Sequence, residues 1–195
     1  MTDHVGAYDA ARADGRASLR ARLVRVAGEV LERVGSEGLS MRPLARAAGC
    51  STMVFYTEFE SKDGLLDALA VSAARALLEA VETVADVDPI AHRRLVAHAY
   101  LDAAFALPEH YRVLFGRPAD GDAGRPRRAL VSDLRRRVVA ALGHGDPDAA
   151  AEERFAVWVH LHGAALLALD AQVTPEEARE VADTAIDTSV SWSVA

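Results

Sequence analysis

Apolar residues recur at helical spacing along most of this chain, and this pattern restricts it to an all-α fold. The clearest example is an apolar stripe that ends at Gly35. It comprises Leu19, Leu23, Val26, Ala27, Val30, Leu31 and Val34. Alanine, the best helix former, fills 40 of the 195 positions, and few segments alternate apolar with polar residues. We therefore predict an all-α protein with about nine helices.

Helix start and stop signals set the boundaries of these helices. Ser40, Ser51 and Ser61 stand at N-cap positions, and an N-cap residue followed by proline opens three later helices, at Asp88, Asp146 and Thr174. The predicted helices cover residues 18–34, 41–48, 52–59, 62–86, 89–107, 109–115, 126–142, 147–170 and 175–190. Residues 1–15 are predicted to form a flexible arm, residues 16–62 a helix-turn-helix domain, and residues 63–195 a second helical domain.

Three simple features exclude whole classes of protein. The single cysteine, Cys50, excludes a disulfide framework and a cysteine-based zinc site. The longest stretch without a charged residue, residues 155–169, has 15 residues and is too short to span a bilayer. No apolar run follows a basic patch at the start, so we expect no signal peptide. These features predict a soluble, cytoplasmic protein that has no membrane partner.

Charge is distributed unevenly along the chain. The net charge is −7, but residues 1–62 carry nine basic and eight acidic side chains, and the acidic excess lies in the remainder. Five arginines fall within fourteen residues: Arg12, Arg16, Arg20, Arg22 and Arg25. A local cationic surface can bind phosphates even on an acidic protein. These arginines form either an ordinary solvated face or an arm that lies along a DNA minor groove.

Two short predicted helices around Gly49 form a helix-turn-helix. Such a turn commonly needs a glycine, because the backbone there takes a positive φ. Leu44, Phe55 and Phe59 can supply the core contacts, with Ala45 where the helices meet. The first turn of the second helix would then enter a DNA major groove. A helix-turn-helix that serves only for packing is the alternative.

The same segment resembles the N-terminal domain of TetR-type transcriptional regulators. The resemblance runs from Leu23 to Leu66 without gaps, through Ser40-Met41-Arg42-Pro43-Leu44-Ala45-Arg46-Ala47-Ala48-Gly49, Phe55-Tyr56 and Ser61-Lys62. It implies a homodimer that binds a palindromic operator in double-stranded DNA. It further implies a repressor that releases DNA when a small-molecule effector enters the C-terminal domain.

The resemblance also implies roles for individual residues. The positions that match base-reading or nearby backbone contacts are Arg42, Thr52, Met53 and Thr57. The positions that match phosphate contacts are Ser40, Ser51, Tyr56 and Lys62. Met53 alternatively covers the turn, and Tyr56 is alternatively a core tyrosine. Three residues depart from the family pattern: Cys50, Val54 and Glu58. The charge of Glu58 would repel phosphate unless it pairs with an arginine or accepts from a cytosine amino group.

The last two predicted helices have the character of a dimer interface. The helix over residues 147–170 is apolar all round between Phe155 and Leu169, so a second subunit is expected to cover one side of it. The last helix carries a stripe of small residues that permits close approach: Ala178, Val181, Ala182, Ala185 and Ser189. We therefore predict a homodimer formed through these two helices.

Aromatic residues and histidines of the second domain are candidates for an effector site. They are His98, Tyr100, Phe105, Tyr111, Phe115, Trp158 and His162. The segment from Trp158 to Gly163 resembles a C-terminal domain class of TetR-type regulators named for its Trp…His-Gly signature. An apolar pocket with a few polar groups suits a drug-like or lipid-like molecule. Ordinary core packing is the alternative, and His98 alternatively pairs with Asp102 one turn on.

Enzymatic and metal chemistry have no support in the residue pattern. His160 and His162 project about 200° apart on a helix, so they cannot chelate one metal ion. We find no nucleophile–base set, phosphate-binding glycine loop or paired carboxylates, and we predict no cofactor and no catalytic residues. A DNA-binding regulator is thus the leading interpretation. The alternative is an all-α ligand-binding or enzyme domain with a vestigial helix-turn-helix.

Overall fold

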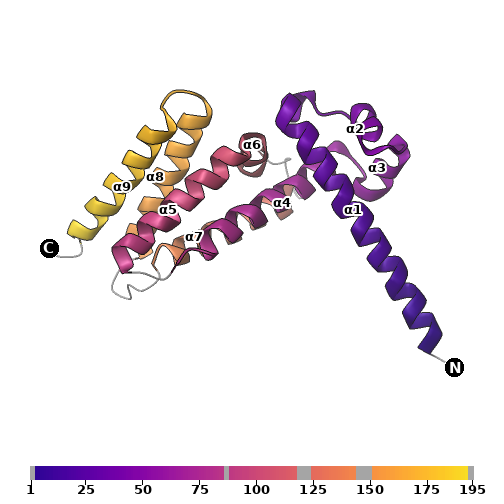
Figure 1. The fold of residues 1–195 in the computed structure, drawn as a ribbon, viewed down its shortest axis with the longest axis horizontal. Helices are drawn as coiled ribbons and strands as arrows, with labels where there is room; N and C mark the ends of the chain where they lie inside the picture. Colours follow the sequence, from indigo (N-terminus) through magenta and orange to yellow (C-terminus); the bar gives the residue numbers. More distant parts are fainter. Residues whose placement is uncertain (1–2, 86–87, 118–123, 144–150, 193–195) are drawn as a thin grey trace. The chain divides into compact units, whose positions relative to one another are not determined.

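A computed structural model describes residues 3–85, 88–117, 124–143 and 151–192, and these ranges contain nine helices (Figure 1). The helices are α1 (Asp3–Gly38), α2 (Met41–Ala48), α3 (Thr52–Phe59), α4 (Lys62–Glu82), α5 (Pro89–Ala106), α6 (Pro108–Phe115), α7 (Arg125–Ala141), α8 (Ala151–Leu169) and α9 (Pro175–Trp192). The described residues contain no strand, which confirms the predicted all-α class. None of these helices is long and apolar enough to cross a membrane.

The chain divides into two compact units, Met1–Ser72 and Ala73–Ala195, and α4 contributes residues to both. In the first unit, the apolar stripe of α1 packs with α2, α3 and the first turns of α4 into one core. Its most deeply buried large side chains are Leu23, Leu31, Leu39, Leu44, Phe55, Leu65 and Leu69. The break predicted at Gly35 is present, since this glycine has φ 69° within α1.

The segment predicted to be a loose arm is helical instead. The helix α1 begins at Asp3, and every side chain from Asp9 to Arg22 is exposed. The prediction was wrong because it took the lack of an apolar face as a sign that these residues form no helix. Residues 3–17 include five alanines, and the intrinsic preference of alanine for the helix continues α1 toward its N-terminus without a buried face.

The predicted caps differ in how they are made. Ser61, Asp88 and Thr174 each accept a hydrogen bond from the backbone N–H three residues on, at 3.1 Å. In the described part of the chain, Ser40 and Ser51 occupy N-cap positions without a side-chain capping bond. The fourth helix ends at Glu82 rather than near residue 86. The predicted cap at Asp146 lies outside the described residues.

In the second unit, α5 and α9 run antiparallel and are joined by two arginine–carboxylate ion pairs and one histidine–carboxylate hydrogen bond, which we call the α5–α9 ladder. Arg94 pairs with Asp187 at 2.5 Å, His98 with Asp183 at 3.1 Å, and Asp102 with Arg179 at 2.5 Å. The partners advance four residues along α5 as they retreat four along α9. The ladder therefore follows one face of each helix.

Candidate nucleic-acid interface

The helix α3 separates an apolar inner face from a more polar outer face. Phe55 and Phe59 are 0% and 3% exposed and anchor the helix in the core of the first unit. Met53 and Tyr56 are 69% and 49% exposed, and Thr57 is exposed beside them. Because residues three and four apart share a helix face, these three side chains form one outward surface. Thr52, one turn before Tyr56, is half-buried at its edge.

The turn before α3 has the geometry that its sequence predicts. Gly49 has φ 67° and ψ 34°, a left-handed conformation that costs little without a Cβ. The next N–H, that of Cys50, donates to the Ala45 carbonyl at 3.0 Å, which closes the end of α2. Cys50 itself is half-buried. The turn thus fixes where α3 begins.

The remaining predicted DNA contacts lie around α3 on the surface of the first unit. Arg42 on α2 is exposed, and so are Ser40 and Ser51 at the starts of α2 and α3. Lys62 is half-buried, and its Nζ donates to the Glu37 carbonyl at 3.4 Å. Hydroxyl, guanidinium and ammonium groups are the kinds of donor that contact phosphate oxygens.

The tight turn between α3 and α4 was not predicted from the sequence. Glu60 has φ 64° and ψ −45°, and the Ser61 N–H donates back across it to the Phe59 carbonyl at 2.6 Å. This is a γ-turn with a positive φ, which is a strained conformation for a residue with a Cβ. The same carbonyl leaves no room for a Cβ at Gly64. The turn sets the position of Lys62 relative to α3.

Glu58, which departs from the family pattern, does not lie on the outer face of α3. Its side chain is 7% exposed, and its carboxylate pairs with the Arg16 Nε at 3.2 Å. The pairing with an arginine that the sequence allowed is therefore present. Nothing in the sequence singled out Arg16 as that partner, because 42 residues separate the two.

In the second unit, five of the seven predicted effector-site residues come together. The Tyr111 hydroxyl lies 2.9 Å from the Tyr100 hydroxyl, and it donates to the His162 Nδ1 at 2.6 Å when the neutral imidazole carries its proton on Nε2. The Phe115 ring lies 4.4 Å from the His162 ring, and the Trp158 ring stacks on it at 5.5 Å. We call these five residues the Tyr–His cluster.

Burial sets the protonation of the Tyr–His cluster. It raises the pKa of the Tyr100 and Tyr111 hydroxyls far above their ordinary value of 10.0, so both remain protonated. It lowers the pKa of His162 below 6.5, so the neutral imidazole is favoured. The buried Trp158 Nε1 lies near the Tyr100 hydroxyl but makes no hydrogen bond of normal geometry among the described residues. Trp158 thus adds an indole N–H to the polar groups of the cluster.

The other two predicted effector-site residues lie apart from the cluster. His98 is a member of the α5–α9 ladder and pairs with Asp183, so its predicted pairing with Asp102 is wrong. The physical reason is that Asp102 is taken by Arg179. The Arg179 guanidinium also lies over the Phe105 ring, 5.9 Å from its centre. Both residues therefore serve the contact between α5 and α9.

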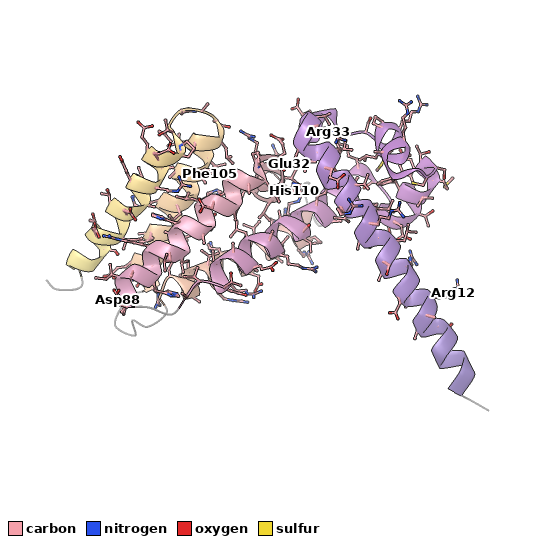
Figure 2. All side chains as sticks on the ribbon, in the orientation of Figure 1. Arg12, Glu32, Arg33, Asp88, Phe105 and His110 are labelled. Atoms are coloured by element: carbon pink, nitrogen blue, oxygen red, sulfur yellow. The ribbon has the colours of Figure 1, made fainter. Side chains whose placement is uncertain are left out.

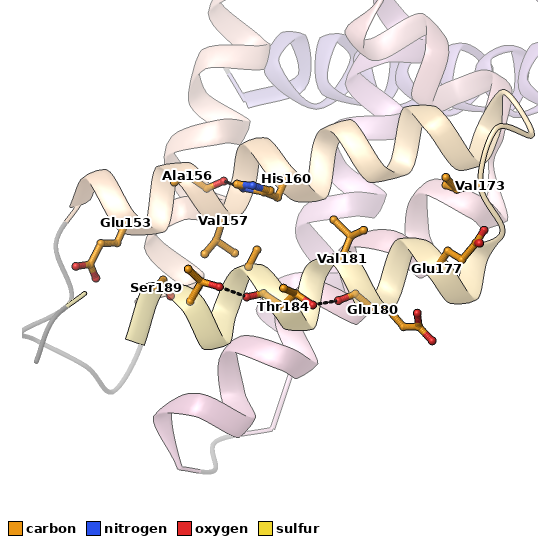
Figure 3. A pocket seen from close by; sticks show the side chains of 12 residues that line it. Glu153, Ala156, Val157, His160, Val173, Glu177, Glu180, Val181, Thr184 and Ser189 are labelled. Atoms are coloured by element: carbon orange, nitrogen blue, oxygen red, sulfur yellow. Dashed lines mark hydrogen bonds between the residues drawn. The ribbon is translucent and has the colours of Figure 1, made fainter. Parts of the chain in front are cut away.

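A groove of about 580 Å³ follows α8 and α9, and the residue pattern did not predict its shape (Figure 3). We call it the α8–α9 groove. Its lining includes Ala156, Val157 and His160 from α8, and Val181, Ala185 and Ser189 from α9. The hydroxyls of Thr184 and Thr188 donate to carbonyls of their own helix at 2.8 Å. Their methyl groups consequently add to the apolar character of the groove.

The small-residue stripe predicted on the last helix is divided between two surfaces. Ala178 and Ala182 are fully buried within their own unit, whereas Val181, Ala185 and Ser189 line the α8–α9 groove. The expectation that the whole stripe faces a partner is thus wrong. The reason is that α9 already packs on α5 and α8 through half of the stripe. Among the described residues, no group of three potential ligands could hold a metal ion.

Comparison with known proteins adds information on ancestry. Residues 23–69 match the family model described as bacterial regulatory proteins, tetR family, and residues 94–189 match the model described as tetracyclin repressor-like, C-terminal domain. An HTH-type transcriptional regulator from Mycobacterium bovis is 33% identical over 138 residues. The match spans 67% of this chain and 56% of the relative, so the chain spans little more than half the length of this relative.

Solved structures agree with the fold. A protein of unknown function from Rhodococcus sp. RHA1 is 28% identical with a TM-score of 0.72, over 88% of this chain and 92% of that one. The TetR family transcriptional regulator PfmR from Thermus thermophilus is 21% identical with a TM-score of 0.60, over 86% and 96% of the two chains. Both units of the present chain thus carry the sequence pattern of one family. The chain belongs to the TetR family of bacterial transcriptional regulators.

Proposed function

We propose that this protein is a cytoplasmic repressor that binds a palindromic operator as a homodimer and releases it when a small molecule binds. The observation that carries the proposal is the outer face of α3. Met53, Tyr56 and Thr57 project from it together, while Phe55 and Phe59 hold the helix in the core. An exposed helix of this size after a helix-turn-helix turn fits a DNA major groove.

The surrounding residues take two roles in this proposal. Arg42, Thr52, Met53 and Thr57 read base edges or adjacent backbone. Ser40, Ser51, Tyr56 and Lys62 bind phosphates and so fix the register of α3 on the duplex. The lack of side-chain capping bonds at Ser40 and Ser51 supports the second role, because their hydroxyls are exposed at helix N-termini.

The α8–α9 groove and its rim supply the proposed dimer interface. Phe155, Val159 and Val181 are 42%, 46% and 42% exposed, so the two helices present large apolar side chains to solvent. A two-fold interface would bury these residues against the same residues of a second copy. A palindromic operator would then offer its two half-sites to the two copies of α3, about one helical turn of ~34 Å or somewhat more apart.

The Tyr–His cluster is the proposed effector site. It offers stacked aromatic rings together with a few polar groups, which suits a drug-like or lipid-like molecule. An effector releases DNA only if it binds the DNA-incompetent conformation more tightly, because equal affinity would shift no population. Since α4 carries residues of both units, a change in its tilt would move Lys62.

The decisive experiment is selection of bound duplexes from a random pool. Recovery of a palindrome with two equal half-sites is expected, and it would support DNA binding and two-fold symmetry together. A pool that remains random after repeated rounds at low ionic strength would refute the proposal. Met53→Ala should change the preferred base in each half-site, whereas Val71→Ala, on α4, should leave the selected sequence unchanged.

The salt dependence of binding tests the phosphate contacts. Lys62→Ala should reduce the magnitude of the slope of log K against log salt by about one, because one fewer counterion is released. Tyr56→Phe should weaken binding to all sequences alike and leave the slope nearly unchanged, because a neutral hydroxyl displaces few counterions. An unchanged slope for Lys62→Ala would remove this residue from the phosphate contacts.

A further inference from the structure

The N-terminal half of α1 contacts the C-terminal end of α3 through two arginines. The Arg16 Nε lies 3.2 Å from the Glu58 carboxylate. The Arg20 guanidinium donates to the Glu58 backbone carbonyl and lies over the Phe59 ring, 4.5 Å from its centre. Arg12 lies one turn before Arg16 on the same segment (Figure 2). An ion pair, a main-chain hydrogen bond and a cation–π contact thus converge on two consecutive residues of α3.

The two side chains of the Arg16–Glu58 ion pair differ in how far they are exposed to solvent. The Arg16 side chain is 68% exposed, whereas the Glu58 side chain is 7% exposed. Glu58 directly follows Thr57, which lies on the outer face of α3. Without Arg16, the Glu58 carboxylate would lose its ion-pair partner near the surface proposed to meet DNA. Arg20 acts at the same end, where the last carbonyls of a helix carry partial negative charge.

We propose that Arg16 and Arg20 are positioning residues for DNA recognition. Arg16 neutralises Glu58, and Arg20 holds the last turn of α3 by its carbonyl and by the Phe59 ring. The extension of α1 before Leu23 is accordingly a functional part of the recognition domain, although its own side chains from residue 9 onward are exposed. This inference rests on the proposed function for its DNA-binding consequence, but the contact itself can be tested without DNA.

The contact is tested first by thermal unfolding of the full chain. Arg16→Ala, Glu58→Gln and the double variant form a cycle in which each single change should lower Tm and the double change should cost less than their sum. A coupling of about 1–3 °C is expected for a partly buried ion pair. Additive shifts would overturn the proposed contact whether or not the protein binds DNA.

The second measurement uses the duplex that the wild-type protein selects from a random pool. Arg16→Ala should bind about fivefold more weakly at low salt, the effect of one unpaired negative charge within a Debye length of the phosphates. Glu58→Gln alone should bind at least as tightly as the wild type. Adding Glu58→Gln to Arg16→Ala should restore affinity to within about twofold of the wild type, since it removes the charge that Arg16 neutralises.

The matched control is Arg22→Ala, which removes the same charge from the exposed surface of α1. Any loss of DNA affinity that Arg22→Ala causes should persist when Glu58→Gln is added. A loss at Arg16→Ala that also persists would show that Arg16 binds phosphate directly, which would overturn its positioning role. If the wild-type protein selects no duplex, the proposed function fails, and the thermal cycle then decides the Arg16–Glu58 contact alone.

Discussion

The two units present opposite kinds of surface. On α3 of the first unit, the large aromatic side chain of Phe55 is buried and the hydroxyl groups of Tyr56 and Thr57 are outside. On α5 and α8 of the second unit, the Tyr100 hydroxyl is fully buried, while Phe155 and Val159 are 42% and 46% exposed. The first surface suits a hydrated polyanion, and the second suits another protein surface.

This difference teaches that burial alone does not identify a functional residue. In the first unit the proposed contacts are exposed, and the buried residues support them. In the second unit Tyr100, Tyr111 and Trp158 of the Tyr–His cluster are buried like core residues, whereas Phe115 and His162 are half-buried. Tyr100, Tyr111 and His162 differ from ordinary core residues in their hydrogen-bonded polar groups. Replacing one member of a buried polar network leaves its hydrogen-bond partner unpaired, and an unpaired buried polar group costs stability.

The largest expected effect separates the two faces of α3. Phe55→Ala should lower the free energy of unfolding by about 3–5 kcal/mol, because it leaves a cavity where the side chain is fully buried. Met53→Ala on the same helix should change it by no more than about 0.5 kcal/mol. Denaturant titration measures both. Similar losses for the two variants would show that α3 has no distinct outer face.

The next effect tests the apolar surface of the second unit. Val181→Glu places a charge in the α8–α9 groove and should weaken the proposed dimer by at least about 100-fold, because an unpaired charge would be buried. Val71→Glu is the matched control, since Val71 is 47% exposed on α4. Sedimentation at several concentrations measures the dimer dissociation constant. A dimer that tolerates Val181→Glu would place the interface elsewhere.

A smaller effect is expected at the turn between α3 and α4. Glu60→Gly should raise the free energy of unfolding by about 0.5–1 kcal/mol, because glycine adopts the positive φ of this γ-turn without strain and the gain exceeds its added chain entropy. Glu60→Ala removes the carboxylate but keeps the Cβ, so it should bring no such gain. Equal stability of the two variants would argue against strain at this position.

The smallest effect concerns the Tyr–His cluster and pH. Burial lowers the pKa of His162 below 6.5, so the unfolded chain binds this proton more readily, and stability falls as the pH drops from 6.5 toward the folded-state value. His162→Asn keeps an acceptor for Tyr111 but does not titrate. It should therefore lose less stability than the wild type between about pH 7.5 and 5.5 in urea titrations. Equal losses would show that His162 is not the titrating group.

Features that depend on local sequence were predictable. The turn at Gly49, the inward-facing Phe55 and Phe59, and the cap at Ser61 all follow from residues within one or two helical turns. The same holds for the exposed positions on α3. Spacing and chain stereochemistry decide these features before any distant contact forms.

Features that depend on distant contacts were not predictable. Arg16 meets Glu58 across 42 residues, and His98 meets Asp183 across 85. The sequence offered His98 a nearer partner in Asp102, which the structure gives to Arg179 instead. Local spacing cannot rank such choices, because only the packing of helices determines which charged faces meet. The strain at Glu60 was hidden for the same reason, since glutamate carries no turn signal.

The α5–α9 ladder has a consequence for how the last helix finds its place. If α9 slid one turn along α5 in one direction, His98 would face Arg179, and neither would keep its present carboxylate partner. A slide of one turn the other way would set Asp102 against Asp183, two negative charges. The order of charges therefore disfavours both misalignments and favours the observed register of α9 on α5.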